Sequence, residues 1–473
     1  MQAQSLSVKR AEVEFHNFAS LGQPERALSR YAEQNHHRGG LIRKYREFIG
    51  PMTPFAELGA NAGHSSYMLA NEFGAGGFAL DISADALRYG AALQDAWNLE
   101  RAPIRVAGDA ANLPFADSSL RFVAAFQMLS QFMDIEAIFL EVKRVLAPGG
   151  VFFFAEEPLR RMLSLRVYRA PYYDLMKPWE RKLHDWGLLG YFVRDVIGAR
   201  QEESFGIRQN HAVGLKDWDR LMRKHFEEIR YDLFVPERGW GERVVKRAAV
   251  RLDPYGSEWR AARLLGGTLA AFCRKAGEPA AVTFDESRFE AQLRCPDCRG
   301  PVARDAADTL RCRNCSYTAA NEGGVYNLLP SADRAELYPG DRADIIDFSL
   351  PGHEARLGAG WHQLEGVFGN RYRWIGPEAS ARLQRVKTGP QRLRVRGHVQ
   401  KGHPIDLRIH VNGRAAGEWK LDAGLFIVEA DVNDAPEYDI VLKAGPEWRA
   451  PGDNRSLTVN LSMIRLAPAG ESE

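Results

Sequence analysis

Four of the five cysteines in this chain occur in two pairs with the same spacing. Cys295 and Cys298 form one C-x2-C pair, and Cys312 and Cys315 form a second pair after thirteen intervening residues. Each pair can lie on a tight turn with both sulfurs facing one ion, so two pairs complete a tetrahedral thiolate site. Zinc is the expected metal, and an iron centre of the rubredoxin type is the chemical alternative. Because four sulfurs saturate the ion, we expect a structural role for it.

A second group of residues could bind a nucleotide-like cofactor. The stretch "ELGANAG" runs from Glu57 to Gly63, and small residues in a strand-to-helix turn let backbone N–H groups approach a ligand closely. Asp81 ends the next apolar run, where a carboxylate can accept hydrogen bonds from a ribose diol. Asn61 stands where such turns often have glycine, and asparagine tolerates a positive φ well. A glycine turn needed only for steric reasons explains this stretch equally well when it is taken alone.

The surrounding pattern predicts the elements that would position these residues. Short apolar runs alternate with helical stretches from residue 54 to about residue 276, which indicates right-handed βαβ units and a parallel sheet. We expect a helix over 64–73 that is opened by a serine cap. The expected strands are 55–59, 76–83, 104–110, 120–127, 149–157, 225–235 and 266–275.

The order of these motifs resembles the core of class I S-adenosylmethionine-dependent methyltransferases. The motifs that carry the resemblance are "ELGANAG", "ALDIS", "AGDAANLPFADSSLRFVAAFQMLSQF" and "EVKRVLAPGGVFFFAEEP". The resemblance is good over residues 50–160 and looser over 160–276. It implies a Rossmann-like domain with a seven-stranded, mostly parallel sheet that binds S-adenosylmethionine.

The resemblance also implies roles for individual residues. The methionine side of the cofactor would be bound by Glu57, Gly59, Ala60, Asn61 and Gly63. Asp81 would hold the ribose hydroxyls, with Ile82 packing on the adenine. Asp109 would accept a hydrogen bond from the adenine amino group, with Ala110 beside it. Gln127 would face the methyl donor or the acceptor. The segment "QMLSQF" lacks a histidine pair that is frequent at this point, so this region does not identify the acceptor.

Methyl transfer to a hydroxyl needs a base whose pKa lies near the working pH. Our preferred candidate is His211, followed by Glu157 at the end of a predicted strand and by His37 ahead of the glycine turn. An insert over about 158–212 mixes arginines with tyrosines and tryptophans. It is either an acceptor pocket, in which aromatic rings stack on sugars or bases, or an amphipathic lid.

The remaining chain resembles two accessory modules. "CPDCRGPV" together with "EGGVYNLLP" resembles the zinc ribbons that accompany methyltransferases, and so short a fold would need metal to fold. Alternating strands and a "VNGR" turn in the last part predict an antiparallel β-sandwich. Its "APGDNRSLTVNLSMIRL" end resembles a module of bacterial polysaccharide-biosynthesis enzymes. Trp374, Trp419 and Trp448 would line a carbohydrate face or belong to the sandwich core.

Length and composition limit the number of domains and the class of protein. A chain of 473 residues with 45% hydrophobic and 26% charged residues predicts several globular domains. A formal net charge of +2 provides no general attraction to nucleic acid. We expect a cytoplasmic protein, with room for peripheral contact at the inner face of the cytoplasmic membrane, because no apolar leader or spanning segment is evident. The expected domains are a helical segment (1–50), a methyltransferase (51–276), a zinc ribbon (288–332) and a sandwich (345–468).

Three functions remain in view at this point. The first is S-adenosylmethionine-dependent methyl transfer to a hydroxyl of a glycan or of a nucleotide- or lipid-linked precursor, alongside other polysaccharide-biosynthesis enzymes. The second is RNA methylation, with the zinc ribbon and the basic insert gripping RNA. The third is a non-catalytic binding protein that kept the methyltransferase fold.

Overall fold

The structure is a computed structural model. It describes residues 9, 13, 24–132, 134–160, 168–170, 177–186, 193–195, 213–237, 239–254, 256–367, 370–450 and 453–469. The chain divides into two compact units. The first lies mostly between Ser29 and Ser331, and the second lies mostly between Ala332 and Glu473.

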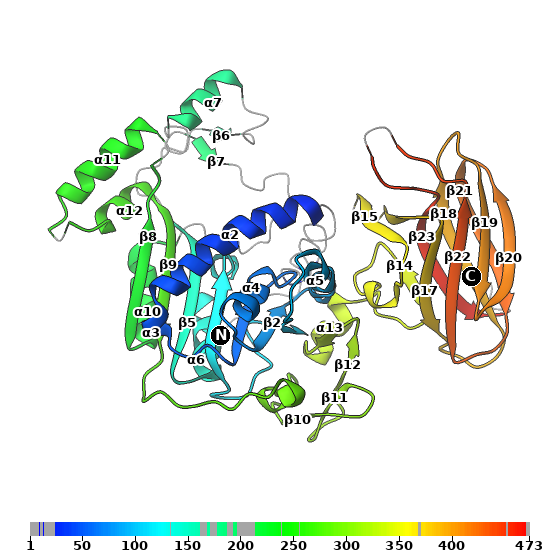
Figure 1. The fold of residues 1–473 in the computed structure, drawn as a ribbon, viewed down its shortest axis with the longest axis horizontal. Coiled ribbons are helices and arrows are strands. Elements are labelled where there is room, and N and C mark those ends of the chain that lie inside the picture. Colours follow the sequence, from blue (N-terminus) through cyan, green and yellow to red (C-terminus); the bar gives the residue numbers. More distant parts are fainter. Residues whose placement is uncertain are drawn as a thin grey trace. The chain divides into compact units, whose positions relative to one another are not determined.

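A twisted sheet forms the centre of the first unit (Figure 1). Seven of its strands come from the part of the chain that resembles a methyltransferase, in the order β3-β2-β1-β4-β5-β9-β8. All of these neighbours are parallel except β9, which runs antiparallel to both β5 and β8. Their bounds are β1 (Phe55–Leu58), β2 (Gly77–Asp81), β3 (Ile104–Ala107), β4 (Leu120–Phe126), β5 (Leu146–Leu159), β8 (Glu228–Phe234) and β9 (Gly267–Arg274).

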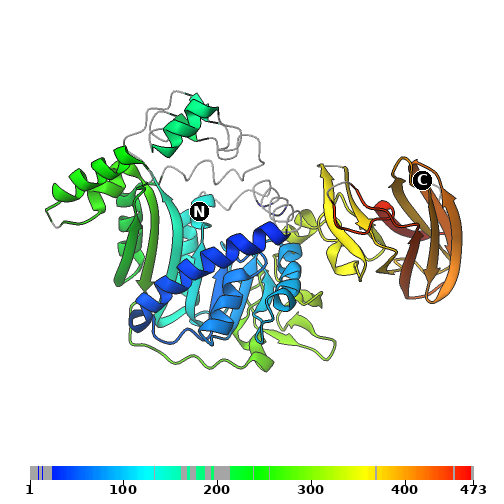
Figure 2. The same ribbon diagram turned by 45° about the horizontal axis from the view of Figure 1, so that its top comes forward.

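Helices cover both faces of this sheet, which is why β1, β2 and β4 are buried along their whole length. On one face lie the helices α2 and α4 (Figure 2). There Phe55 packs with Leu41 and Met68 from these two helices. On the other face Ala56 and Leu58 share a core with Ile138 of α6 and Trp218 of α10. The bounds are α2 (Pro24–Lys44), α3 (Arg46–Ile49), α4 (His64–Glu72), α5 (Ala84–Ala96), α6 (Ile135–Val145), α7 (Pro178–Asp185), α10 (Leu215–His225), α11 (Trp240–Arg251) and α12 (Trp259–Leu265).

The predicted serine cap of the first helix is wrong. Gly63 is the N-cap of α4, and it has a left-handed backbone with φ 85° and ψ 20°. Ser65 and Ser66 lie inside the first turn of the helix and are buried. The Ser66 hydroxyl donates to the Glu57 carboxylate, so it links the helix to β1 instead of capping it.

The four-cysteine segment, residues 288–332, extends the same sheet. Its strands are β10 (Val302–Arg304), β11 (Thr309–Cys312), β12 (Thr318–Glu322) and β13 (Val325–Asn327). β13 pairs parallel with β3, so the sheet runs over eleven strands. Leu310 and Leu328 belong to the same apolar core as Ala56 and Leu58. The sequence did not predict this continuous sheet, because it predicted an independent small fold for the four-cysteine segment. A shared core lessens the need for metal to supply all of the stability of so short a segment.

The second unit contains two antiparallel sheets around one core. One sheet has the order β15-β16-β23-β18-β21, with β14 also paired to β23, and the other has the order β17-β22-β19-β20. Buried side chains of both sheets, such as Val395 and Leu407, share a single cluster. The bounds are β14 (Ile345–Asp347), β15 (Trp361–Val367), β16 (Asn370–Ile375), β17 (Glu378–Gln384), β18 (Gln391–Val399), β19 (Ile405–Val411), β20 (Arg414–Leu421), β21 (Gly424–Val432), β22 (Glu437–Gly445) and β23 (Asn460–Pro468).

The turn predicted from "VNGR" joins β19 to β20. Val411 pairs with Arg414, and the two residues between them, Asn412 and Gly413, both have positive φ. These are the conformations of a two-residue hairpin turn whose twist matches that of the strands. The hairpin prediction is therefore confirmed.

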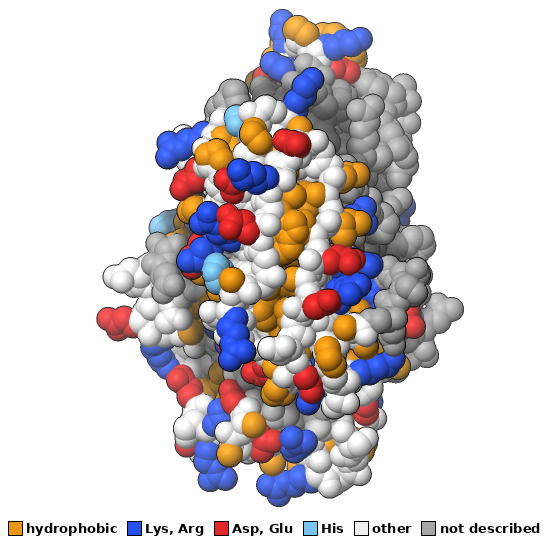
Figure 3. Space-filling view, turned by 90° about the vertical axis from the view of Figure 1, so that its right-hand side faces the viewer, with side chains coloured by type: hydrophobic (Ala, Val, Ile, Leu, Met, Phe, Trp, Pro, Cys, Tyr) orange, Lys and Arg blue, Asp and Glu red, His pale blue; other side chains and the backbone are white. Residues whose placement is uncertain are grey.

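The three tryptophans for which a carbohydrate face was considered, Trp374, Trp419 and Trp448, do not share one surface. Trp374 is buried in β16 and packs edge-on against Trp448, which is stacked on His403. Trp419 lies in β20 of the other sheet, half-buried against the core. Figure 3 shows one face of the molecule, on which hydrophobic side chains gather between charged ones. Leu425 and Ile427 of β21 are exposed apolar residues.

The Asp-x-Arg motif near the end of the chain has a structural partner. Asp453 accepts hydrogen bonds from the Arg455 guanidinium, which also reaches Glu365 in β15 at 2.6 Å. This charged hydrogen bonding holds the pKa of Asp453 down to about 2. The motif therefore fastens the last loop of the sandwich to β15.

Candidate cofactor site and four-cysteine cluster

The first strand-to-helix turn places three residues in the left-handed region. Gly59, Asn61 and Gly63 have φ of 65°, 53° and 85°. The Asn61 side-chain oxygen accepts from the Ala62 N–H at 2.7 Å, which offsets the cost of this conformation for a residue with a Cβ. A Cβ at Gly59 would lie 3.0 Å from Met128, so this position also needs glycine for space. The expectation that Asn61 adopts a glycine-like backbone is confirmed.

Asp81 joins this turn to the next strand. Its carboxylate accepts from the Asn61 N–H at 2.7 Å and from the Ser83 N–H at 2.8 Å, and its side chain is buried. Ile82 follows it and is half-buried. The carboxylate predicted to hold the ribose therefore also fixes the turn predicted to hold the methionine end of the cofactor.

Glu57 provides a buried acid below the turn. It lies on β1 and is 3% exposed, and burial raises its pKa to about 7. The hydrogen bond from Ser66 and the charge of Arg38 oppose this shift. An acid with this pKa can exchange its proton near neutral pH when a cation approaches.

Asp109 follows β3 and already has a cationic partner. The ammonium of Lys9 lies 2.7 Å from its carboxylate, and both side chains are less than 10% exposed. Its other oxygen accepts from the Ala111 N–H at 2.8 Å, and Ala110 between them is buried. An adenine amino group at this carboxylate would share it with Lys9 or displace Lys9.

The ends of β4 and β5 carry two further residues with positive φ. Gln127 has φ 53° and is exposed, so its side chain is available to a ligand. Glu156 has φ 65° and accepts two hydrogen bonds from Arg38 of α2, at 2.7 and 2.8 Å. The Arg38 guanidinium also lies over the ring of Phe126, at 4.3 Å from its centroid. Residues held in sparsely populated conformations often cluster at functional edges of a fold.

The three candidate bases have very different surroundings. Glu157 is fully buried, and its two oxygens accept from the N–H groups of Met128, Leu129 and Ser130 at 2.8–3.0 Å. These bonds make it an anchor for the loop after β4. Burial nevertheless raises its pKa to about 7, and a catalytic role for it stays a prediction. His37 is exposed on α2 beside Phe234, with ring centroids 4.9 Å apart. His211 lies outside the described residues.

The predicted cofactor residues come together along one edge of the sheet. Those of β1, β2, β3 and β4 all lie at or just after the carboxyl ends of adjacent parallel strands, where ligands bind in open α/β sheets. The insert begins at the same edge, because it follows the end of β5 at Leu159. Its two ends meet where the Arg160 N–H donates to the Val213 carbonyl at 2.9 Å. Most of the insert lies outside the described residues, so the choice between pocket and lid stays a prediction.

The four paired cysteines form a compact cluster. Their sulfurs all lie within 4.8 Å of one another, with Cys295 3.7 Å from Cys315 and Cys298 3.4 Å from Cys312. A tetrahedral ion with Zn–S bonds of about 2.3 Å places its sulfurs about 3.8 Å apart. The cluster therefore fits a metal ion of this size. Among the described residues it is the only group of cysteine, histidine or acidic side chains with this geometry.

Three basic residues that contact the candidate cofactor edge or the loop after β3 were not identified from the sequence. Arg38 and Lys9 reach the site from segments ahead of the first strand, and Arg294 reaches it from the four-cysteine segment. Each lies in a polar stretch with many other basic residues, so no local pattern singles it out. Only the spatial arrangement shows which of these cations are buried and paired.

One family model matches part of the first unit. Residues 56–154 match the family model described as a methyltransferase domain. This match supports a class I methyltransferase domain in the first unit, with S-adenosylmethionine as its cofactor. The match ends before the four-cysteine segment and the second unit.

Solved structures with similar folds were compared over about half of the chain. A sarcosine dimethylglycine methyltransferase described as putative, from Galdieria sulphuraria, is 14% identical, covering 52% of this chain and 86% of that chain, with a TM-score of 0.34. A complex between the Trm112 methyltransferase activator of Haloferax volcanii and a methyltransferase described as putative is 19% identical, covering 56% and 98%, with a TM-score of 0.32. No curated protein matches the chain significantly. Among the described residues no helix is both long and apolar enough to span a membrane.

Proposed function

We propose that this protein transfers the methyl group of S-adenosylmethionine to a hydroxyl of a glycan or glycan precursor. The methyltransferase domain supports the donor. The resemblance of the last strands to a module of polysaccharide-biosynthesis enzymes supports the acceptor class. The single observation that carries the donor half of the proposal is the turn in which Asn61 and Asp81 hold each other at the carboxyl edge of the sheet.

The chain's own residues bind and orient the donor in this proposal. The glycine turn and the Glu57 carboxyl would meet the methionine end, and Asp81 would hold the ribose. Asp109 and Ala110 meet the adenine. S-adenosylmethionine, when bound, supplies an activated methyl group on its sulfonium. Most of the rate gain comes from holding the acceptor oxygen in line with that methyl group, and a base then removes the hydroxyl proton.

Features of α11 support an acceptor that carries phosphate, such as a nucleotide- or lipid-linked sugar. This helix follows the carboxyl end of β8, and its Arg243, Arg247 and Arg251 line a hollow of about 370 Å³. Lys246 in the same hollow is paired with Glu237 and Glu258. Trp240 at the start of the helix is 76% exposed. Arginines grip phosphate, and an exposed indole can stack on a sugar or a base.

Calorimetry with S-adenosylmethionine tests the donor half. We expect the unmodified protein to bind, and we expect Asp81→Ala to weaken binding about tenfold or more, because charged hydrogen bonds of this kind contribute about 1.5–3 kcal/mol. Asp217→Ala is the matched control, since Asp217 is exposed on α10. Absence of binding in the unmodified protein would end the methyltransferase proposal and favour a non-catalytic binding protein.

Transfer of a labelled methyl group tests the acceptor half. The protein and methyl-labelled S-adenosylmethionine are incubated with separate glycan, nucleotide-sugar, lipid-linked sugar and RNA fractions. We expect label in a carbohydrate fraction that is released by ether cleavage and not by nuclease. Label that appears only in RNA would replace the glycan proposal with RNA methylation.

A further inference from the structure

The loop that follows β3, residues 108–116, is enclosed by the four-cysteine segment at its start. This loop carries Asp109 and Ala110, the predicted adenine contacts. Immediately before it, Asn327 of β13 is paired with Ala107 of β3, and the Leu328 N–H donates to the Ala107 carbonyl at 2.8 Å. The entry to the adenine loop is therefore fixed by a strand of the four-cysteine segment.

The end of the same loop is fixed by the residues that lead into the first cysteine pair. The Ala116 N–H donates to the Gln292 carbonyl at 2.8 Å, and the Arg294 N–H donates to the Pro114 carbonyl at 3.0 Å. Phe115 forms an isolated bridge with Leu293. Both ends of the loop thus depend on backbone contacts from one other segment.

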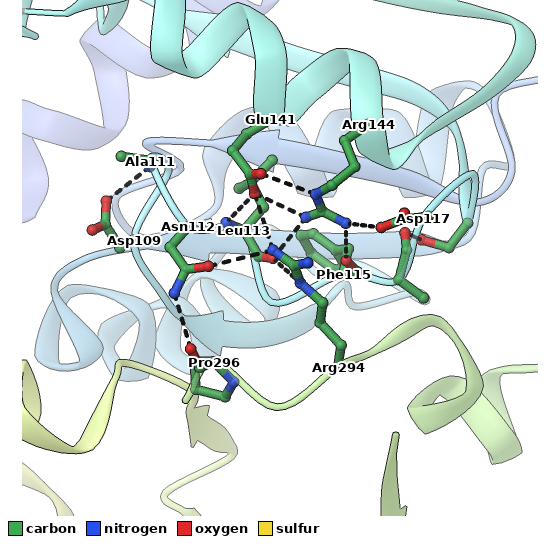
Figure 4. Close-up of polar contacts among 12 residues, drawn as sticks. Asp109, Ala111, Asn112, Leu113, Phe115, Asp117, Glu141, Arg144, Arg294 and Pro296 are labelled. Carbon is green, nitrogen blue, oxygen red and sulfur yellow. Dashed lines mark hydrogen bonds and ion pairs between the residues drawn. The ribbon is translucent and has the colours of Figure 1, made fainter. Parts of the chain in front are cut away.

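The middle of the loop is held by residues on either side of Cys295 (Figure 4). The Asn112 amide donates to the Pro296 carbonyl at 3.1 Å, and its oxygen accepts from the Arg294 guanidinium at 3.3 Å. Arg294 also donates to the Leu113 carbonyl at 3.2 Å. The Arg294 side chain is 6% exposed, so leaving it without these partners would be costly.

The helix α6 completes this network from the other side. Glu141 accepts from the Leu113 N–H at 2.9 Å and pairs with Arg294 at 3.3 Å (Figure 4). Arg144 donates to the carbonyls of Leu113 and Phe115 at 3.0 and 2.8 Å. The loop therefore lies between α6 and the four-cysteine segment, and Arg294 contacts both.

We propose that the four-cysteine segment is a brace for the adenine loop, so that filling the four-cysteine site raises the affinity for S-adenosylmethionine. The inference rests on the proposed function. Cys295 is fully buried between Arg294 and Pro296, and a metal that fixes Cys295 fixes the two residues that hold Asn112 and Leu113. Because binding couplings are reciprocal, the cofactor must in turn favour retention of the metal.

A variant that keeps all four cysteines directly tests whether the four-cysteine segment stabilises the adenine loop. Asn112→Ala removes the two side-chain contacts to the flanks of Cys295 and leaves the thiols intact. We expect zinc content equal to that of the unmodified protein and about fivefold to tenfold weaker S-adenosylmethionine binding in calorimetry. Arg311→Ala is the matched control, because Arg311 pairs with Asp305 inside the four-cysteine segment and should leave the affinity unchanged.

Metal competition tests the coupling from the other side. The zinc-loaded protein is equilibrated with a competing chelator, and the zinc transferred is measured with and without S-adenosylmethionine. We expect less zinc to be lost when the cofactor is present, and we expect the Asn112→Ala protein to show a smaller protection.

The outcomes separate this inference from the proposed function. If the unmodified protein binds S-adenosylmethionine, the methyltransferase proposal stands whatever Asn112→Ala does. Two results together would overturn the proposal that the four-cysteine segment stabilises the adenine loop. The unmodified protein and Asn112→Ala would bind S-adenosylmethionine with equal affinity, and zinc loss would be the same with and without cofactor. If the metal-free protein unfolds, the metal-loaded Asn112→Ala protein still decides the question, with its thermal transition as the check of folding.

Discussion

Asn61 shows how one residue can keep the conformation of a strand-to-helix turn in which glycine is common. Its φ of 53° lies in the left-handed region, and its own side chain accepts from the next N–H. Its backbone N–H donates to Asp81, so the conformation of the turn and the position of the Asp81 carboxylate depend on each other. A residue with a branched Cβ cannot adopt this backbone without strain.

The strain at Asn61 can be measured by substitution. We expect Asn61→Val to lower the free energy of unfolding by about 1–3 kcal/mol, because valine is disfavoured at positive φ. Asn61→Gly should differ from the unmodified protein by less than about 1 kcal/mol, because glycine adopts this backbone freely. Urea unfolding followed by circular dichroism compares the three proteins. Equal stability of the valine and glycine variants would contradict the assigned conformation.

Glu57 makes the stability of the first unit depend on pH. Burial raises its pKa from 4.5 to about 7, so the folded protein binds this proton more tightly than the unfolded chain does. The stabilisation is complete below pH 4.5 and is lost as the pH rises through about 7. By linkage this one group contributes about 3 kcal/mol over that window.

Comparison with Glu57→Gln isolates this contribution. Glutamine keeps a side-chain oxygen for the Ser66 hydroxyl and does not titrate. We expect the unmodified protein to lose stability relative to Glu57→Gln between pH 4.5 and 7, as measured by urea unfolding at closely spaced pH values. A difference between the two proteins that does not change with pH would show that the acid is not buried as described.

Among the helices, α2 is attached to the carboxyl edge of the sheet by one buried cation. Arg38 donates to both oxygens of Glu156 and to the Ser65 hydroxyl, and it lies over Phe126. It therefore joins α2 to the start of α4 and to the ends of β4 and β5. Such a pair contributes little net stability when intact, but removal of one partner leaves an uncompensated buried charge.

Two arginines of α2 provide a matched test of this attachment. We expect Arg38→Ala to lower the free energy of unfolding by about 3–5 kcal/mol, because Glu156 would lose its partner at a site where the arginine side chain is only 6% exposed. Arg43→Ala removes an exposed pair with Glu72 and should cost less than about 1 kcal/mol. Thermal and urea unfolding of the two variants give the comparison, and similar losses for both would refute the buried role of Arg38.

In the molecule as a whole, the two units have separate cores. The core of the first unit runs from the methyltransferase sheet into the four-cysteine segment, and the core of the second is built from its two antiparallel sheets. A cavity made in one core removes packing from that unit alone. The four-cysteine segment therefore belongs, in energetic terms, with the methyltransferase domain.

Cavity mutations in the second unit test this division. Leu407 is fully buried in the sandwich core, and we expect Leu407→Ala to cost about 2–5 kcal/mol in that unit. Scanning calorimetry should show a lower transition for the second unit, while S-adenosylmethionine binding stays unchanged. Leu310→Ala in the four-cysteine segment should instead lower the transition of the first unit. Weakened cofactor binding in Leu407→Ala would contradict the division.

The order of the elements and the chemistry at their ends were predictable from local sequence patterns. Alternating apolar runs predicted the strands of the first unit because both faces of a parallel sheet are buried. The glycine turn with Asn61 and the hairpin at Asn412-Gly413 were predictable because positive φ restricts the choice of residue. Two C-x2-C pairs predicted the four-cysteine cluster because each pair can direct two sulfurs at one ion.

Contacts between residues far apart in the sequence could be identified only in the folded structure. Residues far apart in the chain are joined by the pairing of β13 with β3, by the Lys9–Asp109 and Arg38–Glu156 ion pairs, and by Arg294 beside the loop 108–116. Local propensity holds no information about such partners, because nothing in the neighbouring residues distinguishes a cation that will be buried from one that stays exposed. Which of these partners pair depends on the surfaces that the packed core brings together. The contacts between the four-cysteine segment and the loop 108–116 could therefore be found only in the fold.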